Sequence, residues 1–357
     1  MFHKYYTIIT KILQIYWLFF QNVIFFRHQK TDDKQSLGDA KLEEWTLAIG
    51  DIIVGIDIGT SKVSLVIGEV NNFNQIEVIC TTTHKCNGIR KGKIVDENEI
   101  ASSIHHLIKD AESETDLKIN SAYVTIPGKY VTIVKNSVVK EAKDKYAGIS
   151  AKDVVSSIMQ VKDIDIPEGK QIIDIVENQF VLENGRTVSD PVGNLSGSFT
   201  LKAEVILADR EYMKQIASIF RKVDLDIDGL VPITLAQRSL ALDANELNDN
   251  VMLLDIGAGN TEIGVFDGQS FVYTNTIPLG GDNITNDIAL VLNISEEEAE
   301  RLKKQYGLDI LHNIDKFPVN MDKAVIGYYR AVTNCLTKSY GIVDYIRSER
   351  LYVMRSK

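Results

Sequence analysis

The feature that most constrains the fold of this chain is an internal repeat. Residues Val54–Gly68 read VGIDIGTSKVSLVIG, and Met252–Phe266 read MLLDIGAGNTEIGVF. Aligned without gaps, each copy is an apolar strand, an Asp-Ile-Gly triplet, a short polar turn and a second strand of alternating pattern. The alignment pairs Asp57 with Asp255. Because the copies lie far apart in the chain, each can occupy its own lobe, and the repeat predicts a two-lobed α/β protein.

The Asp-Ile-Gly turn has the chemistry of a phosphate-binding hairpin. Its strand delivers an aspartate, its glycine lets the backbone approach a ligand, and the amides that follow can converge on phosphate oxygens. A carboxylate beside a polyphosphate needs a cation between them, so Asp57 and Asp255 predict Mg²⁺, held largely through waters. One such hairpin is a common structural turn, but two matching copies favour a nucleotide gripped from both sides. The candidate residues are Asp57, Gly59, Thr60, Ser61 and Lys62 in the first copy, and Asp255, Gly257, Ala258, Gly259, Asn260 and Thr261 in the second.

Composition narrows the class of protein. The chain has 357 residues, which is enough for about two domains. Lys and Arg number 39 against 49 Asp and Glu, a net charge of -10 that argues against a nucleic-acid partner. Cys80, Cys86 and Cys335 are too few for a disulfide framework or a four-cysteine zinc site, and a reducing cytoplasm is the expected environment.

The two hairpins resemble the phosphate loops of the actin/Hsp70/sugar-kinase superfamily. Within it, the chain is similar to the FtsA family of bacterial actin-like cell-division proteins over about Ile52–Asp309. VGIDIGTSKV resembles the family's first loop and LLDIGAGNTEIGVF its second. GIRKGKIVDENEIASSI (88–104) resembles the start of an inserted subdomain, and PVGNLSGSFTLKAEVIL (191–207) the return to the main lobe. IPLGGDNITNDIA and AERLKKQYG match the helical region after the second loop.

The resemblance implies an α/β, two-lobed actin-like (ribonuclease H-like) fold with a small αβ subdomain inserted. The expected ranges are 51–90 and 168–245 for the first lobe, 91–167 for the insertion, and 246–312 for the second lobe. No adenine-binding Gly-Gly loop or later family helix is recognised after Asp309. The second lobe is therefore expected to be incomplete, either because the chain is truncated or frame-shifted or because an unrelated tail, 313–357, replaces those parts. In that tail, Ile342, Val343, Ile346 and Val353 can share a helical face, unless the terminus is simply solvated.

Residues 1–50 form an N-terminal extension with its own character. The apolar run Ile12–Phe26 is followed directly by Arg27 and not by a cleavage site, which argues against a secretory signal. The run is shorter than the roughly 20 residues of a membrane-spanning helix. An uncleaved anchor, an interfacial helix and an accidental extension upstream of the true start remain three open interpretations, and the rest of the extension reads as a polar linker.

The resemblance also implies roles for residues outside the hairpins. Gln237 lies on a helix expected between the lobes and is the candidate for orienting the attacking water, although a surface glutamine is the alternative. Gly280 and Gly281 follow the second loop. Glu300 and Lys303 match the segment that approaches the ribose and base, with an ordinary ion pair on a helix face as the alternative.

The function that the resemblance implies is that of a cell-division protein that binds ATP and Mg²⁺, polymerises, and tethers FtsZ filaments to the cytoplasmic face of the bacterial membrane at the septum. Residues 91–167 are expected to contact other subunits and other division proteins. At most a weak ATPase activity is expected, and whether the chain is an enzyme stays open. A small-molecule kinase of the same superfamily and a degenerate scaffold that binds no nucleotide are the alternatives.

Overall fold

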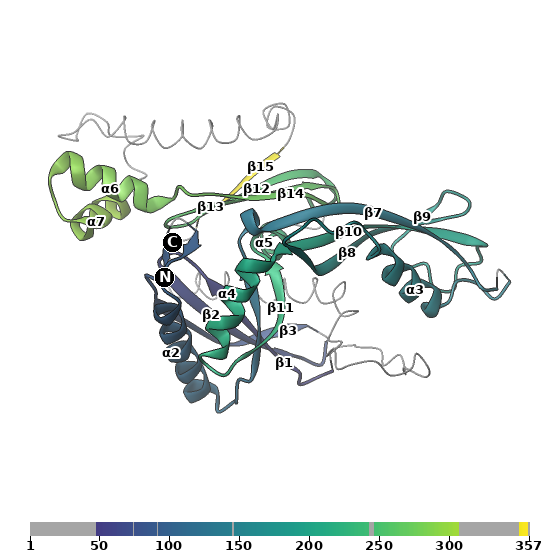
Figure 1. The fold of residues 1–357 in the computed structure, drawn as a ribbon, viewed down its shortest axis with the longest axis horizontal. Helices are drawn as coiled ribbons and strands as arrows, with labels where there is room; N and C mark the ends of the chain where they lie inside the picture. Colours follow the sequence, from purple (N-terminus) through teal and green to yellow (C-terminus); the bar gives the residue numbers. More distant parts are fainter. Residues whose placement is uncertain are drawn as a thin grey trace.

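The computed structural model describes residues 48–306 and 350–355, apart from 74, 91, 145 and 243–245. The apolar run 12–26 and residues 313–349 of the predicted tail lie outside the described residues. The described residues form three larger sheets with helices against them, and a two-stranded sheet (Figure 1). In the part of the chain that is described, no helix has the length and apolar character needed to span a membrane.

The first lobe is built on a five-stranded sheet in the order β11-β6-β1-β2-β3. Its strands are β1 (Ile52–Ile58), β2 (Lys62–Val70), β3 (Ile76–Lys85), β6 (Ser121–Ile126) and β11 (Asp226–Pro232). Strands β1, β2 and β3 form an antiparallel meander, whereas β6 pairs in parallel with both β1 and β11. The near-continuous apolar run of β1 is buried because β1 is a central strand with both faces covered.

Two helices lie against this sheet, α2 (Glu97–Thr115) and α4 (Arg210–Arg221). The apolar positions of α2 recur at helical spacing, and Ile100, Ile104 and Leu107 are fully buried against β2 and β3. These side chains belong to the largest hydrophobic core of the described chain. The first lobe is therefore stabilised mainly by burial of the apolar stripe of each helix on the sheet.

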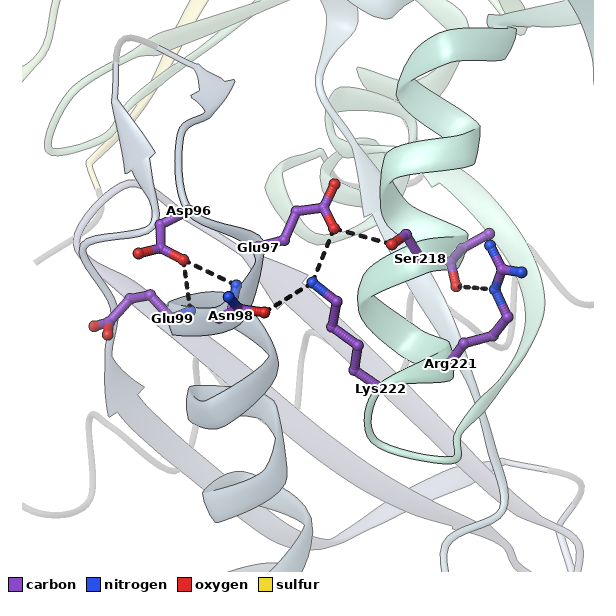
Figure 2. A network of polar contacts seen from close by, with 8 residues as sticks. Asp96, Glu97, Asn98, Glu99, Ser218, Arg221 and Lys222 are labelled. Atoms are coloured by element: carbon purple, nitrogen blue, oxygen red, sulfur yellow. Dashed lines mark hydrogen bonds and ion pairs between the residues drawn. The ribbon is translucent and has the colours of Figure 1, made fainter.

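Polar contacts join the start of α2 to the end of α4 (Figure 2). Asp96 is the N-cap of α2, and its Oδ1 accepts a hydrogen bond from the Asn98 amide at 2.9 Å. Lys222 Nζ lies 3.0 Å from Glu97 Oε2 and 2.9 Å from Asn98 Oδ1. Ser218 Oγ donates to the same oxygen of Glu97 at 2.9 Å. These contacts link the first turn of α2 to the C-terminal end of α4.

The inserted module is a separate four-stranded sheet in the order β7-β10-β8-β9, with α3 packed against it. The elements are β7 (Val131–Glu141), α3 (Ala151–Val161), β8 (Lys170–Leu182), β9 (Thr187–Val188) and β10 (Ser198–Asp209). It has its own hydrophobic core. In Figure 1 this module lies at the opposite end of the molecule from α6 and α7.

The limits predicted for the insertion, 91–167, are therefore wrong. Helix α2 lies inside that range, but its apolar face packs on β2 and β3 of the first lobe. The predicted end separates α3 from β8, although β8 pairs with β10 along nearly its whole length. The pairing of β8 and β10 is a long-range contact, and no local pattern in the sequence marks it.

The second lobe is built on a four-stranded sheet in the order β14-β13-β12-β15. Its elements are β12 (Asn250–Ile256), β13 (Thr261–Asp267), β14 (Ser270–Ile277), α6 (Gly281–Leu292), α7 (Glu296–Tyr306) and β15 (Arg350–Arg355). Strand β15 pairs in parallel with β12, from Val251–Arg350 to Ile256–Arg355. The helical face predicted to include Val353 is wrong at that residue, because pairing with β12 holds this segment in a strand.

Shorter elements lie between the larger ones. They are β4 (Ile89–Arg90), β5 (Lys93–Ile94), η2 (Gly128–Tyr130), α5 (Ile233–Ala241) and η3 (Glu246–Asn248). Helix α5 begins directly after β11 and reaches the second lobe, where Thr234 Oγ1 lies 3.1 Å from Thr274 Oγ1. Arg238 donates to the carbonyl oxygens of Leu247 at 2.8 Å and Gly268 at 2.7 Å. Helix α5 therefore contacts both lobes, as predicted for a helix that lies between them.

The inserted sheet meets the second lobe through a buried polar cluster. Ser270, at the start of β14, donates from Oγ to Glu204 Oε1 on β10, and Asn178 Nδ2 on β8 donates to Ser270 Oγ at 2.8 Å. Glu204 is only 2% exposed, and burial raises the pKa of its carboxyl group. The hydroxyl of Ser270 therefore serves polar groups on two strands of the insertion.

Replacing Ser270 with alanine should lower the free energy of unfolding by about 1–3 kcal/mol, because the buried Glu204 loses a donor and Asn178 an acceptor. Urea denaturation of the full chain measures this change. Ser137→Ala, at an exposed position on β7, is the matched control and should stay within about 0.5 kcal/mol of the unsubstituted chain. Equal effects of the two substitutions would contradict a stabilising role for the cluster.

Candidate functional site

The two copies of the sequence repeat are two β-hairpins with the same turn. In the first, the Gly59 amide donates to the Lys62 carbonyl oxygen at 2.9 Å. In the second, the Gly257 amide donates to the Asn260 carbonyl oxygen at 2.8 Å. A Cβ on Gly59 would lie 2.9 Å from that Lys62 oxygen, so a side chain has no room there. The aligned positions in the sequence are therefore equivalent positions in the backbone.

The two turns touch each other. Asn260 Nδ2 in the second hairpin donates to Thr60 Oγ1 in the first at 3.3 Å. A Cβ on Gly259 would lie 2.5 Å from Thr60 Cγ2, so glycine is required for this approach. The hairpins thus face one another across the boundary between the lobes.

The two predicted carboxylates, Asp57 and Asp255, lie close enough for the charge of Asp57 to affect the pKa of Asp255. Burial, together with the nearby charge of Asp57, raises the pKa of Asp255 to about 6. Burial also raises the pKa of Asp57, whose Oδ1 accepts a hydrogen bond from Thr125 Oγ1 at 2.7 Å. The ammonium of Lys62 lowers the pKa of both groups. Two neighbouring acids that burial disfavours as anions form a donor set that suits a hard divalent cation.

Gln237 lies beside the second of these carboxylates. Its Nε2 donates to Asp255 Oδ2 at 2.5 Å, while its Oε1 is buried and has no hydrogen-bond partner among the described residues. Asn260 Oδ1 is likewise buried without a partner in this part of the chain. Buried polar atoms are normally hydrogen-bonded, so these two oxygens fit a site that is completed by a ligand or by water. No group of three or more His, Cys, Asp or Glu residues within the described ranges is arranged to hold a metal ion.

The first turn of α6 is attached to the second hairpin. The Gly281 amide donates to the Gly257 carbonyl oxygen at 2.9 Å, and the Asp282 amide donates to that of Ala258 at 2.8 Å. A Cβ on Gly280 would lie 2.3 Å from the Ala258 oxygen, which explains the glycine at this position. The predicted Gly280-Gly281 pair therefore lies against the second phosphate-type turn.

Glu300 and Lys303 face the same end of α6. Lys303 Nζ donates to the Gly281 carbonyl oxygen at 3.0 Å and to Thr285 Oγ1 at 2.9 Å. It also lies 2.5 Å from Glu300 Oε2, and Glu300 accepts a hydrogen bond from Thr285 Oγ1. The pair is thus part of a polar cluster between α6 and α7, close to the second hairpin. Ser61 and Thr261, the remaining candidates, lie within the first turn and at the start of β13.

One acidic residue of the site was not predicted. Glu262 on β13 is 5% exposed, and its Oε2 accepts hydrogen bonds from the Gly128 amide at 2.9 Å and from Thr276 Oγ1 at 2.8 Å. Burial, together with the nearby charges of Asp255 and Asp57, raises its pKa to about 8. Glu262 therefore belongs to the same cluster of acids and connects the second hairpin to the η2 turn.

The sequence carries a signal for Glu262, but only once strand pairing is considered. Asp255 and Glu262 are directly opposite each other in the β12–β13 ladder, an arrangement that is unfavourable for like charges unless something compensates. The internal repeat hides this signal, because the position in the first hairpin that matches Glu262 is Ser64.

Comparisons with known proteins agree with this architecture. The family model for cell division protein FtsA matches residues 252–327, and the model for the SHS2 domain inserted in FtsA matches residues 128–207. The chain is 30% identical to the FtsA proteins of Pseudomonas aeruginosa and Bacillus subtilis over 257 residues, 72% of its length. This chain is an FtsA-like, actin-like protein. It spans 61% and 58% of the lengths of those two relatives.

A solved structure supports the fold. The PilM–PilN type IV pilus biogenesis complex contains a chain that superposes with a TM-score of 0.55 at 16% identity, covering 85% of this chain and 81% of that one. At this level of identity the likeness concerns the fold alone. The actin-like α/β architecture with an inserted subdomain, predicted from the FtsA resemblance, is confirmed.

The family models also refine two predicted boundaries. The SHS2 match, 128–207, coincides with the separate sheet β7–β10 and not with the predicted 91–167. The FtsA match runs to residue 327, beyond Asp309, where the sequence resemblance was expected to end. The tail predicted to begin at residue 313 therefore starts with sequence of FtsA type.

The raised pKa of Glu262 makes stability depend on pH. In the folded protein Glu262 loses its proton near pH 8, whereas in the unfolded chain it does so near 4.5. The protonated form of Glu262 thus contributes to the free energy of unfolding at low pH. This contribution is lost as the pH rises from about 4.5 to 8. Glu262→Gln, without added nucleotide, should be more stable than the unsubstituted chain above pH 8 by a few kcal/mol, and the gap should close toward pH 5.

Urea unfolding across this pH range measures the difference. Glu69→Gln, at an exposed position on β2, is the control and should follow the unsubstituted chain. A Glu262→Gln curve parallel to that of the unsubstituted chain at every pH would contradict the shifted pKa.

Proposed function

We propose that this FtsA-like chain binds ATP with Mg²⁺ between its two hairpins. The observation that supports this most is the pair of acids, Asp57 and Asp255, at the ends of equivalent strands whose turns are in contact. Burying two such groups together is costly without a bound cation. The unpartnered buried oxygens of Gln237 and Asn260 support a ligand at the same place.

The residues of the site fall into three groups, which would bind the phosphates, the metal ion and a water molecule. The amides and hydroxyls of the two turns, with the ammonium of Lys62, suit phosphate oxygens. Asp57 and Asp255 would hold the hydrated metal ion, which neutralises phosphate charge when bound. Gln237, whose Nε2 is held by Asp255, has its Oε1 in position to accept a hydrogen bond from a water molecule. From this set we expect at most slow ATP hydrolysis.

The other end of the nucleotide belongs at the α6–α7 cluster. The first turn of α6 contacts the second hairpin through Gly281, and Lys303 and Glu300 lie next to that turn. A ribose offers hydroxyl groups that an ammonium and a carboxylate can bind from two sides. We therefore assign the ribose and base to this side of the second hairpin.

Asp57→Asn should abolish Mg²⁺-dependent binding of a fluorescent ATP analogue, because one of the two carboxylates for the hydrated metal is lost. Fluorescence anisotropy of the full chain, titrated with and without Mg²⁺, measures the loss. Asp267→Asn, at the exposed far end of β13, changes the same charge on a hairpin of the site and should leave binding intact. Unchanged binding in Asp57→Asn would sink the proposed site.

We further propose the cellular role of the FtsA proteins for this chain. In that role it polymerises and tethers FtsZ filaments to the cytoplasmic face of the membrane at the division septum. The inserted module, with both its edge strand β9 and its helix α3 away from the second lobe, is the proposed surface for neighbouring subunits and other division proteins. The apolar run 12–26 is the proposed membrane attachment, because aromatic and aliphatic side chains between basic flanks suit a lipid interface.

FtsZ filaments should sediment with anionic vesicles only when the full chain is present. Replacing Phe19 and Phe20 together by aspartate should leave FtsZ in the supernatant, because charged side chains oppose insertion into the lipid interface. Sedimentation of the chain with vesicles in the absence of FtsZ separates the membrane step from the FtsZ step. Equal vesicle binding by the double variant and the unsubstituted chain would show that this run is not the attachment.

A further inference from the structure

The η2 turn that opens the inserted module is held by the second lobe. The Gly128 amide donates to Glu262 Oε2 at 2.9 Å, and the Lys129 amide donates to Thr276 Oγ1 at 3.1 Å. A Cβ on Gly128 would lie 2.4 Å from Thr274 Oγ1, so the turn has no room to move closer. The backbone from which the Lys129 side chain extends is therefore fixed at the boundary between the lobes.

The side chain of Lys129 reaches the second hairpin. A Cβ on Gly92 would lie 2.8 Å from Lys129 Nζ and 3.0 Å from Asn260 Nδ2. Both nitrogen atoms therefore lie close to the same side of Gly92. Gly92 has a φ of +68°, and its carbonyl oxygen accepts a hydrogen bond from Tyr130 Oη at 3.2 Å. The β4–β5 turn thus brings the ammonium of Lys129 together with the amide of Asn260, one of the proposed phosphate-binding residues.

The charges around this ammonium favour an anion. Burial lowers the pKa of Lys129 and the charge of Lys93 lowers it further, while Glu262 raises it. Glu262 Oε2 already accepts two hydrogen bonds, from the Gly128 amide and Thr276 Oγ1, so pairing with Lys129 is not needed to satisfy that oxygen. The ammonium also lies 4.8 Å from the centre of the Tyr130 ring, and an anionic ligand would add a charge-assisted contact to the interactions that Lys129 already makes.

The second hairpin has two distinct flanks. On one flank, Gly257 and Ala258 are bonded to the first turn of α6, where the ribose and base are assigned. On the other, Asn260 meets Thr60 of the first hairpin and lies beside Lys129. A nucleotide with its base at α6 therefore extends its phosphate chain toward the flank that carries Lys129.

We propose that Lys129 contacts the terminal phosphate of bound ATP and makes the site distinguish ATP from ADP. The proposal rests on the proposed nucleotide function and adds a specificity residue to it. ADP lacks the phosphate that reaches this flank, so it gains nothing from the ammonium. Because β7 starts at the residue after η2, the same contact lies at the base of the inserted module.

The test compares the affinities of fluorescent ATP and ADP analogues for the full chain in the presence of Mg²⁺. Lys129→Ala should weaken ATP binding about tenfold to a hundredfold, the range for a lost charge-assisted hydrogen bond, and leave ADP binding within about twofold. Lys129→Met keeps the aliphatic stem and should give the same result, and Lys129→Arg should keep most of the preference for ATP. Lys303→Ala, on the α6–α7 side, is the control and should weaken both nucleotides equally.

The outcomes separate the possibilities. Equal weakening of ATP and ADP by both Lys129→Ala and Lys129→Met would mean that the residue only supports the fold, and no weakening would mean that it does not reach the phosphate. Either result overturns the proposal while the nucleotide site stands. Failure of the unsubstituted chain to bind either analogue would instead contradict the proposed function itself.

Discussion

The structure depends on a concentration of buried acidic groups at the boundary between its two lobes. Asp57, Asp255 and Glu262 come from three different strands, and burial raises the pKa of each. Such a cluster is expensive unless protons, hydrogen-bond donors or a cation compensate it. Thr125, Gln237, Thr276 and the Gly128 amide supply the donors. The geometry of both hairpins can be understood as the framework that holds these acids together.

Hydrogen bonds join the inserted module to the second lobe, whereas the module has a separate hydrophobic core. The contacts are the Glu204–Ser270–Asn178 cluster and the bonds of the η2 turn to Glu262 and Thr276. Apolar contacts tolerate sliding, whereas hydrogen bonds between buried groups hold one geometry, because a broken bond leaves an unsatisfied group. The η2 turn, which is bonded to Glu262 of the second hairpin, leads directly into the first strand of the insertion.

Local patterns in the sequence predicted the parts of the site that repeat. The two Asp-Ile-Gly turns, the pairing of Asp57 with Asp255 and the glycines that permit close approach follow from residue type and spacing alone. Gln237 was assigned through the FtsA resemblance, and its contact with Asp255 agrees with a helix between the lobes. Glu262 and Lys129 were missed because each acts through a partner that is distant in the sequence.

The sequence by itself determined the duplicated hairpin, the strand-to-turn chemistry and the family. Each motif that carries these predictions lies within about fifteen consecutive residues, where backbone preference and hydrophobic period operate. Only the tertiary structure decided that the insertion spans β7–β10, that residues 350–355 form a strand beside β12, and that Lys129 lies next to Asn260. These facts arise from pairing between distant segments, whose free energy comes from burial and hydrogen bonds that form only when the chain has folded.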